Sequence, residues 1–585
     1  MPIETKRALL GKRDWLAALA TVVAALALYA FNAEDCVYPG ESAHLAAVWG
    51  GLDTSSFGMY PLAHAFTDLF GRFAPPVFGA LAVSFLYLVV AAFVRARAGG
   101  DEAARHAASS AMVGGLVASV TFMLTPAVES AATHLEPRMF AAAWAMLSFL
   151  LLFASAAAPK WLGWMLVVAS GAVSGTGLAD SPLFLMLFPL QFAAAWVASK
   201  ASGGKGYGAA TALLLVCIVA FFSFAPAATG DFGEYVKFQT AAARAYFAPK
   251  GWLFVPFFTT IPFVVSLFSS ASAYRDRGGW TQWLFHLAMT FIAVLSVATA
   301  LSPSSIAREC GQLPVATSAF AAFVAAYVAA YWWMQARTGA RVNESLDSEP
   351  TSTGRVIAYV AGGVLAVALV FSGLLNLFSF DSKAGAFADK VADKVVDDMD
   401  GRTWFVTDGT LDDHLRFAAA RKGRELNLIC LQRDLDKAYL ADLGELVKAK
   451  GLGGEKSNDL AISLSLGVLT FVQDWLADDP EAAKSVVVFG APDLWHAANV
   501  KPVPEFAFFG SDPSRKADWS AWKELDAVLS APKGWAATSS GRTRIPSRRC
   551  GSTSAATSDS SRQTAACGCR TRDATTTRSR CTSSS

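Results

Sequence analysis

Charged side chains are scarce in this chain. Asp, Glu, Lys and Arg make up 16% of its 585 residues, against about 25% in an average soluble domain. Hydrophobic residues make up 54%, and the mean hydropathy is +0.38. This balance excludes an ordinary soluble enzyme and indicates a membrane protein that carries a soluble part. The net charge of +2 says little, because topology depends on where the Lys and Arg lie along the chain. We expect no nucleic-acid partner.

Cysteine is also rare, and its distribution excludes a structural zinc site. Half of the eight cysteines follow residue 549, and no Cys-x-x-Cys pair or Cys/His cluster precedes that point. Cys36 and Cys310 could form a disulfide if both face an oxidising compartment.

Residues 534–585 lack what a folded core needs. No Lys follows Lys533, aliphatic residues almost disappear, and Arg, Ser and Thr dominate. We interpret this segment as a disordered tail or, preferably, as out-of-frame translation, and assign no function to its cysteines.

Long apolar runs fill the first two thirds of the chain. A helix needs about 20 mostly apolar residues to cross the hydrocarbon core. The first run is followed by Asn32-Ala-Glu-Asp-Cys36 instead of a small-residue cleavage site, so an uncleaved span is favoured over a signal peptide. Many runs are rich in Ala and Gly, which suits close helix packing. We predict about eleven spans, at 14–33, 75–95, 107–125, 138–157, 161–178, 182–199, 207–226, 251–270, 283–302, 314–334 and 355–378.

The cations predict an orientation. Lys6, Arg7, Lys12 and Arg13 precede the first span, which places the N-terminus in the cytoplasm. Alternation of the loops then places everything after residue 379 outside. We therefore predict a multi-pass protein of the cytoplasmic (inner) membrane with an extracytoplasmic C-terminal domain.

Residues 380–533 have the composition of a soluble domain. A charged amphipathic helix is expected over Asp389–Asp400, and a strand–helix–strand pattern follows it. This pattern predicts a small α/β domain with a largely parallel sheet. Asp408-Gly409 ends its first strand, where such sheets bind ligands, although one Asp-Gly pair is weak evidence and a plain turn is the better default. The expected strands are Thr403–Asp408, Leu426–Leu431, Ser485–Gly490 and Glu505–Gly510.

The predicted spans contain almost no ionisable residues, whereas ion-coupled transporters place such groups in mid-membrane. We therefore expect chemistry in the outer loops. In the first of these, Asp35, Glu41, His44 and Asp53 can titrate. Glu41 follows Pro39-Gly40 at the start of a short expected helix, where it could act as a general base. Alternatively, it is an acidic first-turn residue favoured by the helix dipole.

The second outer loop carries Glu129, His134, Glu136 and Arg138. A second carboxylate could share a divalent metal or orient an acceptor, and Arg138 could bind a phosphate. The alternative is a polar cap on the next span, with Pro137 at an early helical position.

Three further cations could meet a lipid phosphate at the outer headgroup level. They are Lys237, Arg244 and Arg308. The alternative is that they anchor helices at the membrane interface.

In several of these residues the chain resembles the C-type glycosyltransferase (GT-C) superfamily. Within that superfamily it is most similar to the bacterial protein O-mannosyltransferase-like membrane proteins. Gly40-Glu41-Ser42 corresponds to a Gly-Glu-Phe-like motif after the first span, and Tyr60-Pro61-Leu62 to the end of a His-Pro-Pro-Gly-x-Pro-Leu-like stretch. Glu136 matches an acidic residue at the fourth span, and Thr403–Ala420 a strand, turn and helix after the last. The chain departs from the pattern at Pro39, where the family has Asp, and at residues 56–59.

The resemblance implies transfer of a sugar from a polyprenyl-phosphate donor to a protein or glycan acceptor outside the membrane. Glu41 would deprotonate the acceptor hydroxyl, with Glu136 as a second catalytic residue, and His44, Asp53 and the cations would bind substrate. No cofactor is assigned, and a divalent metal is an open alternative. Two other hypotheses remain: a non-catalytic membrane scaffold in envelope assembly, and a lipid-linked sugar transporter, which the charge-poor spans disfavour.

Overall fold

The computed structural model divides the chain into two compact units, which are described one at a time. One unit comprises Met1–Asp35 and Phe57–Phe380, and the other comprises Cys36–Ser56 and Asp381–Ser585. The structure describes residues 10–33, 37–52, 60–97, 101–181, 183–201, 206–229, 233, 236–237, 240, 261–268, 280–301, 315–338, 352–377, 383–434, 436–452, 457–479, 481–497, 499–515, 520 and 523.

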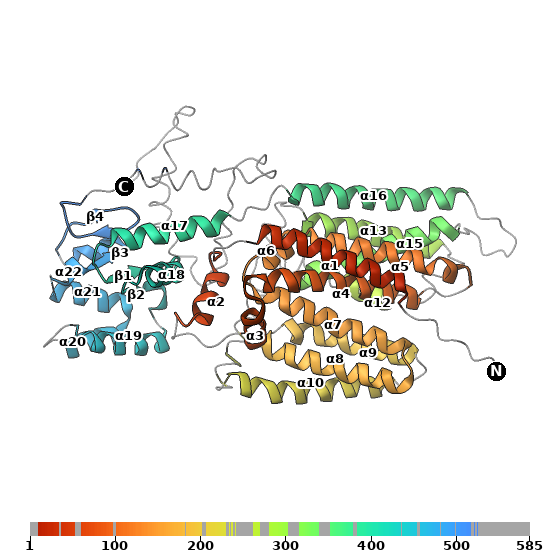
Figure 1. Ribbon diagram of the computed structural model, residues 1–585, viewed down its shortest axis with the longest axis horizontal. Helices are drawn as coiled ribbons and strands as arrows, with labels where there is room; N and C mark the ends of the chain where they lie inside the picture. Colours follow the sequence, from red (N-terminus) through yellow and green to blue (C-terminus); the bar gives the residue numbers. More distant parts are fainter. Residues whose placement is uncertain are drawn as a thin grey trace, which may run out of the picture. The chain divides into compact units, whose positions relative to one another are not determined.

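The first unit is a bundle of apolar helices (Figure 1). Its longer described helices are α1 (Lys12–Asn32), α4 (Ala74–Arg97), α5 (Asp101–Met123), α7 (Pro137–Ala157), α8 (Lys160–Asp180), α9 (Leu183–Ala201), α10 (Gly206–Thr229), α13 (Trp280–Leu301), α15 (Val315–Thr338) and α16 (Ser352–Leu377). Its shorter ones are α3 (Pro61–Phe70), α6 (Pro126–Thr133) and α12 (Ile261–Phe268), with a 3₁₀ turn, η1, at Gly71–Phe73.

Seven helical stretches within the described residues are long and apolar enough to cross a membrane. Three shorter apolar stretches accompany them, at Leu187–Trp196, Gly208–Phe224 and Leu284–Val297. The architecture is that of a polytopic helical membrane protein, and the number of eleven spans remains a prediction. The seven stretches are Lys12–Asn32, Pro61–Arg95, His106–Met123, Pro137–Ala156, Lys160–Asp180, Ser318–Arg337 and Arg355–Leu374.

Small residues set the spacing between the bundle helices. The stretches that contain α4 and α15 are 83% and 89% buried, whereas those of α1 and α16 are 28% buried, so α4 and α15 lie inside the bundle. A Cβ on Gly115 of α5 would lie 2.6 Å from the Tyr87 ring of α4. Only glycine permits this approach, as the Ala- and Gly-rich runs predict.

The second unit contains a five-stranded sheet of order β2-β1-β3-β5-β4. β1 lies parallel to both β2 and β3, with Val406 opposite Ile429 and Val488. β5 is antiparallel to β3 and to β4. The strands are β1 (Trp404–Thr407), β2 (Asn427–Cys430), β3 (Val486–Val488), β4 (Val503–Pro504) and β5 (Phe509–Gly510).

The predicted strand–helix–strand unit is confirmed, and the last expected strand is corrected. Residues 505–510 contain only β5, and β4 precedes them. The two short strands pair antiparallel around Glu505–Phe508, so the sheet is mixed instead of largely parallel. Its helices are α17 (Lys383–Asp398), α18 (Asp412–Lys422), α19 (Lys437–Ala449), α20 (Ser457–Leu466), α21 (Val468–Asp478), α22 (Ala482–Ser485) and the 3₁₀ turns η4 (Leu431–Arg433) and η6 (Pro492–His496).

Alternating side chains of the strands place one helical layer on each face of the sheet. Trp404 and Val406 join a buried cluster with residues of α19, α20 and α21, including Trp475. Phe405, between them in sequence, joins a cluster with α17 and α18. This follows from the two-residue period of a strand.

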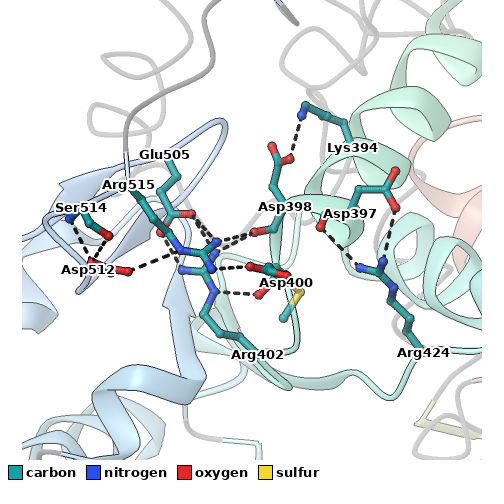
Figure 2. Close-up of polar contacts among 11 residues, drawn as sticks. Lys394, Asp397, Asp398, Asp400, Arg402, Arg424, Glu505, Asp512, Ser514 and Arg515 are labelled. Atoms are coloured by element: carbon teal, nitrogen blue, oxygen red, sulfur yellow. Dashed lines mark hydrogen bonds and ion pairs between the residues drawn. The ribbon is translucent and has the colours of Figure 1, made fainter.

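A network of ion pairs surrounds the start of β1 (Figure 2). Arg402 donates to the Glu505 carboxylate through its two terminal guanidinium nitrogens, at 2.6 and 2.7 Å, and both side chains are buried. Arg515 lies 2.6 Å from Asp400 and 3.7 Å from Glu505. The network joins the segment before β1 to the segment after β4, and all its members are paired with one another.

Candidate functional site

Two of the predicted site residues meet where α7 begins. Glu136 is the N-cap of α7, and Arg138 is the second residue of the helix. The Glu136 carboxylate lies 3.5 Å from the Arg138 guanidinium, and the two side chains are 12% and 24% exposed. A carboxylate and a cation therefore stand together, partly open to solvent, at a helix N-terminus, which favours negative charge.

The other titratable residues of this loop are buried against neighbouring helices. Asn32 of α1 donates to the Glu129 carboxylate in α6 at 3.0 Å. His134 follows α6, and its Nδ1 lies 3.4 Å from the Ser130 hydroxyl. Glu129 and His134 are therefore buried residues that contact neighbouring side chains. Glu136 and Arg138 are the more accessible pair.

Asp180, the last residue of α8, belongs to the same end of the bundle. Close to it, Trp144 of α7 donates to Thr176 of α8 at 3.1 Å, so the start of α7 and the end of α8 lie together. The Asp180 carboxylate accepts hydrogen bonds from the backbone of α3. In the sequence, its only signal is an Asp before Ser-Pro at the end of an apolar run.

Glu41 is the first residue of α2 (Glu41–Trp49), a helix of the second unit. Gly40 before it has φ of 96°, a conformation that other residues adopt with strain. The short helix expected after Pro39-Gly40 is confirmed, while the side chain of Glu41 lies outside the described part of the structure. Glu136 belongs to the first unit, so the two predicted carboxylates fall in different units.

His44 meets the α/β domain instead of another predicted site residue. α2 packs against α18, and His44 Nδ1 lies 3.6 Å from an Asp413 oxygen of α18. Asp413 also binds Arg416 at 3.1 Å. The sequence alone gave no reason to connect residues so far apart.

The remaining predicted residues contribute no described geometry. Lys237 is exposed. Asp53, Arg244 and Arg308 lie outside the described residues, as do Cys36, Cys310 and the tail at 534–585.

The carboxyl end of β1 carries a compact acidic turn. Asp408 accepts hydrogen bonds from the amide and hydroxyl of Thr410, the amide at 3.0 Å. Burial raises the pKa of Asp412 to about 6, against the opposing Thr407 hydrogen bond. Such an edge, where strand order reverses, is where α/β sheets bind ligands.

Metal binding and thiol chemistry have little support in the described part of the chain. Among them, no group of three His, Cys, Asp or Glu side chains could hold a metal ion. Burial raises the pKa of the Cys430 thiol to about 12, which disfavours a nucleophilic thiolate.

No protein-family model, curated protein or solved structure matches this chain.

Proposed function

We propose that this protein is a GT-C-like membrane glycosyltransferase that uses a polyprenyl-phosphate-linked sugar. The observation that carries the proposal is the Glu136–Arg138 pair at one end of an apolar helix bundle. A donor of this class has a membrane-embedded lipid tail and a phosphate at the headgroup level. A guanidinium there can bind the phosphate, and a carboxylate can orient hydroxyl groups.

In the proposed reaction, Glu41 accepts the proton of the acceptor hydroxyl. The acceptor oxygen then forms a bond to the anomeric carbon, and the bond from that carbon to the phosphate oxygen breaks. The polyprenyl phosphate leaves with the electron pair, stabilised by Arg138 and by Lys237, Arg244 or Arg308. A divalent metal on the phosphate is compatible with this scheme and is not required by it.

The proposal includes the finer architecture expected from the sequence. Eleven spans place the N-terminus in the cytoplasm and the reaction on the outer face of the cytoplasmic membrane. The α/β unit then binds a protein or glycan acceptor outside, and His44 and Asp53 contribute to substrate binding.

A second candidate function is a non-catalytic membrane scaffold in envelope assembly. The observation that favours it is the contact of α2 with α18. The contact shows that α2 packs within the second unit, and a scaffold needs α2 only for such packing.

The two candidates are separated by assaying the full-length protein in lipid nanodiscs. The assay follows consumption of polyprenyl-phosphate-linked mannose and glucose by wild type, Glu41→Gln and Glu481→Gln. Glu481 is an exposed carboxylate of the second unit, paired with Lys484, and serves as the matched control. The enzyme candidate predicts consumption that Glu41→Gln alone removes, and the scaffold candidate predicts no consumption by any of the three.

A further inference from the structure

A carboxylate is buried where α8 ends. Asp180 is 1% exposed. Its Oδ1 accepts hydrogen bonds from the Leu62 amide at 2.8 Å and the Ala63 amide at 3.4 Å. Its Oδ2 has no hydrogen-bond partner among the described residues. Burying a carboxylate without hydrogen-bond donors costs folding free energy, and the two amides of α3 offset that cost.

The start of α3 needs an acceptor from outside the helix. The first amides of any helix lack partners within it. The N-cap of α3 is Tyr60, which makes no capping bond through its side chain and adopts a left-handed conformation with φ of 55°. Asp180 therefore performs the task that Ser, Asp or Asn performs at an ordinary N-cap. It does so from another helix, 118 residues away in sequence from Leu62.

Aromatic contacts fix where the capped helix lies. The Phe66 ring of α3 lies 5.5 Å from the rings of both Phe78 and Phe140. Phe140 is in the first turn of α7, the helix that begins at the Glu136 cap. α3 thus packs on the turn that carries the Glu136–Arg138 pair.

We infer that Asp180 is a positioning residue that holds α3 in place as one wall of the donor site. The inference rests on the proposed function and assigns Asp180 and α3 to donor binding. Without the cap, α3 is docked in a smaller fraction of molecules. Donor affinity falls by the same fraction, whereas the groups that carry the reaction are unchanged. The apparent KM for the donor therefore rises while kcat is kept.

The test compares Asp180→Ala and Asp180→Asn with the control Asp68→Ala in the full chain in nanodiscs. Asp68 is an exposed carboxylate of α3 itself, 3.5 Å from His64. Hydrogen exchange of the α3 amides reports positioning independently of catalysis, and kinetics with polyprenyl-phosphate mannose report donor binding. Asp180→Ala is expected to speed α3 exchange and raise KM by about tenfold each, with kcat within about twofold.

The Asn variant separates capping from general damage. Its amide oxygen still accepts the two hydrogen bonds. The α3 exchange rate and the donor KM of Asp180→Asn are therefore expected to stay within about threefold of the wild-type values. If Asp180→Ala does not fold, Asp180→Leu carries the test, because it fills a similar volume and has no acceptor. Exchange in α3 must then rise more than in α7. Asp68→Ala, which leaves the cap intact, is expected to keep α3 exchange at the wild-type rate.

Several results would overturn the inference, and one would overturn only its basis. Unchanged α3 exchange in Asp180→Ala contradicts the capping role. Faster exchange with KM unchanged contradicts the role of α3 in donor binding. Faster exchange in a protein whose wild type consumes no donor rejects the proposed function and leaves Asp180 as the residue that positions α3.

Discussion

Arg402 and Glu505 form a buried ion pair with good geometry, 8% and 6% exposed. Removing one partner leaves an unpaired buried charge, so we expect Glu505→Gln to destabilise the α/β unit by about 3–5 kcal/mol. The control Lys484→Met breaks the exposed pair with Glu481 and is expected to cost about 1 kcal/mol or less. Hydrogen exchange of the β1 amides in the full chain measures both.

The double variant Arg402→Met/Glu505→Leu sharpens this prediction. It removes both charges, so much of the stability lost in Glu505→Gln is expected to return. A single-variant cost no larger than that of Lys484→Met would contradict the account of the network in Figure 2.

Asp412 gives the α/β unit a pH dependence. Burial raises its pKa to about 6, above the value of about 3.9 in an unfolded chain. The folded state binds the proton more tightly, so the contribution to stability is complete below pH 4. It is lost as pH rises through 6. The expected loss is about 3 kcal/mol at most, from about two pKa units.

Asp412→Asn tests this assignment. The variant carries no titrating group, so this loss of stability between pH 4 and 7 is expected to disappear from β1 exchange corrected for the intrinsic rate. Asp408→Asn, which changes a neighbouring partly exposed carboxylate, is expected to retain most of it. An Asp412→Asn profile that falls as steeply as the wild-type profile would reject the assignment.

At the scale of elements, α2 contacts α18 through the His44–Asp413 pair, and substitutions that change the charge of these two residues test whether the pair stabilises α2. His44 and Asp413 are 37% and 19% exposed, so their pairing contributes about 1 kcal/mol or less. Asp413→Lys is expected to speed exchange of the α2 amides about two- to fivefold, and adding His44→Glu is expected to restore them. Arg416→Gln breaks the other contact of Asp413 and should leave α2 unchanged.

If Asp413→Lys leaves α2 exchange at the wild-type rate, the contact with α18 does not stabilise α2. If Arg416→Gln has the same effect as Asp413→Lys, the cause lies within α18 instead of in the His44 contact.

Elements with a strong period were predictable from the sequence, and contacts between distant elements were not. Thr403–Asp408 and Leu426–Leu431 contain β1 and β2, because alternation and flanking turns identify strands locally. The run Glu505–Gly510 looked like another strand, but its residues turn back from β4 into β5. Asp180 accepts hydrogen bonds from the start of α3, and Asp413 contacts His44 of α2. No local sequence pattern connects either aspartate to the helix that it contacts.

At the scale of the whole molecule, composition identifies a membrane protein with a soluble part, and the structure adds an unexpected grouping. Residues 36–56 belong with the second unit, although more than 300 residues separate them from Asp381. A composition boundary near residue 379 cannot reveal this, since it reads only neighbouring residues. The same grouping assigns Glu41 to the second unit and Glu136 to the first, although both were singled out from the sequence.

The most direct test of the central claim is the rate of sugar transfer from polyprenyl-phosphate mannose or glucose by wild type and Glu41→Gln. A general base contributes about 10²–10⁴-fold, so we expect Glu41→Gln to lose activity by that factor. The donor KM should stay near the wild-type value, and Glu481→Gln should be fully active. Transfer by Glu41→Gln at the wild-type rate would contradict the account.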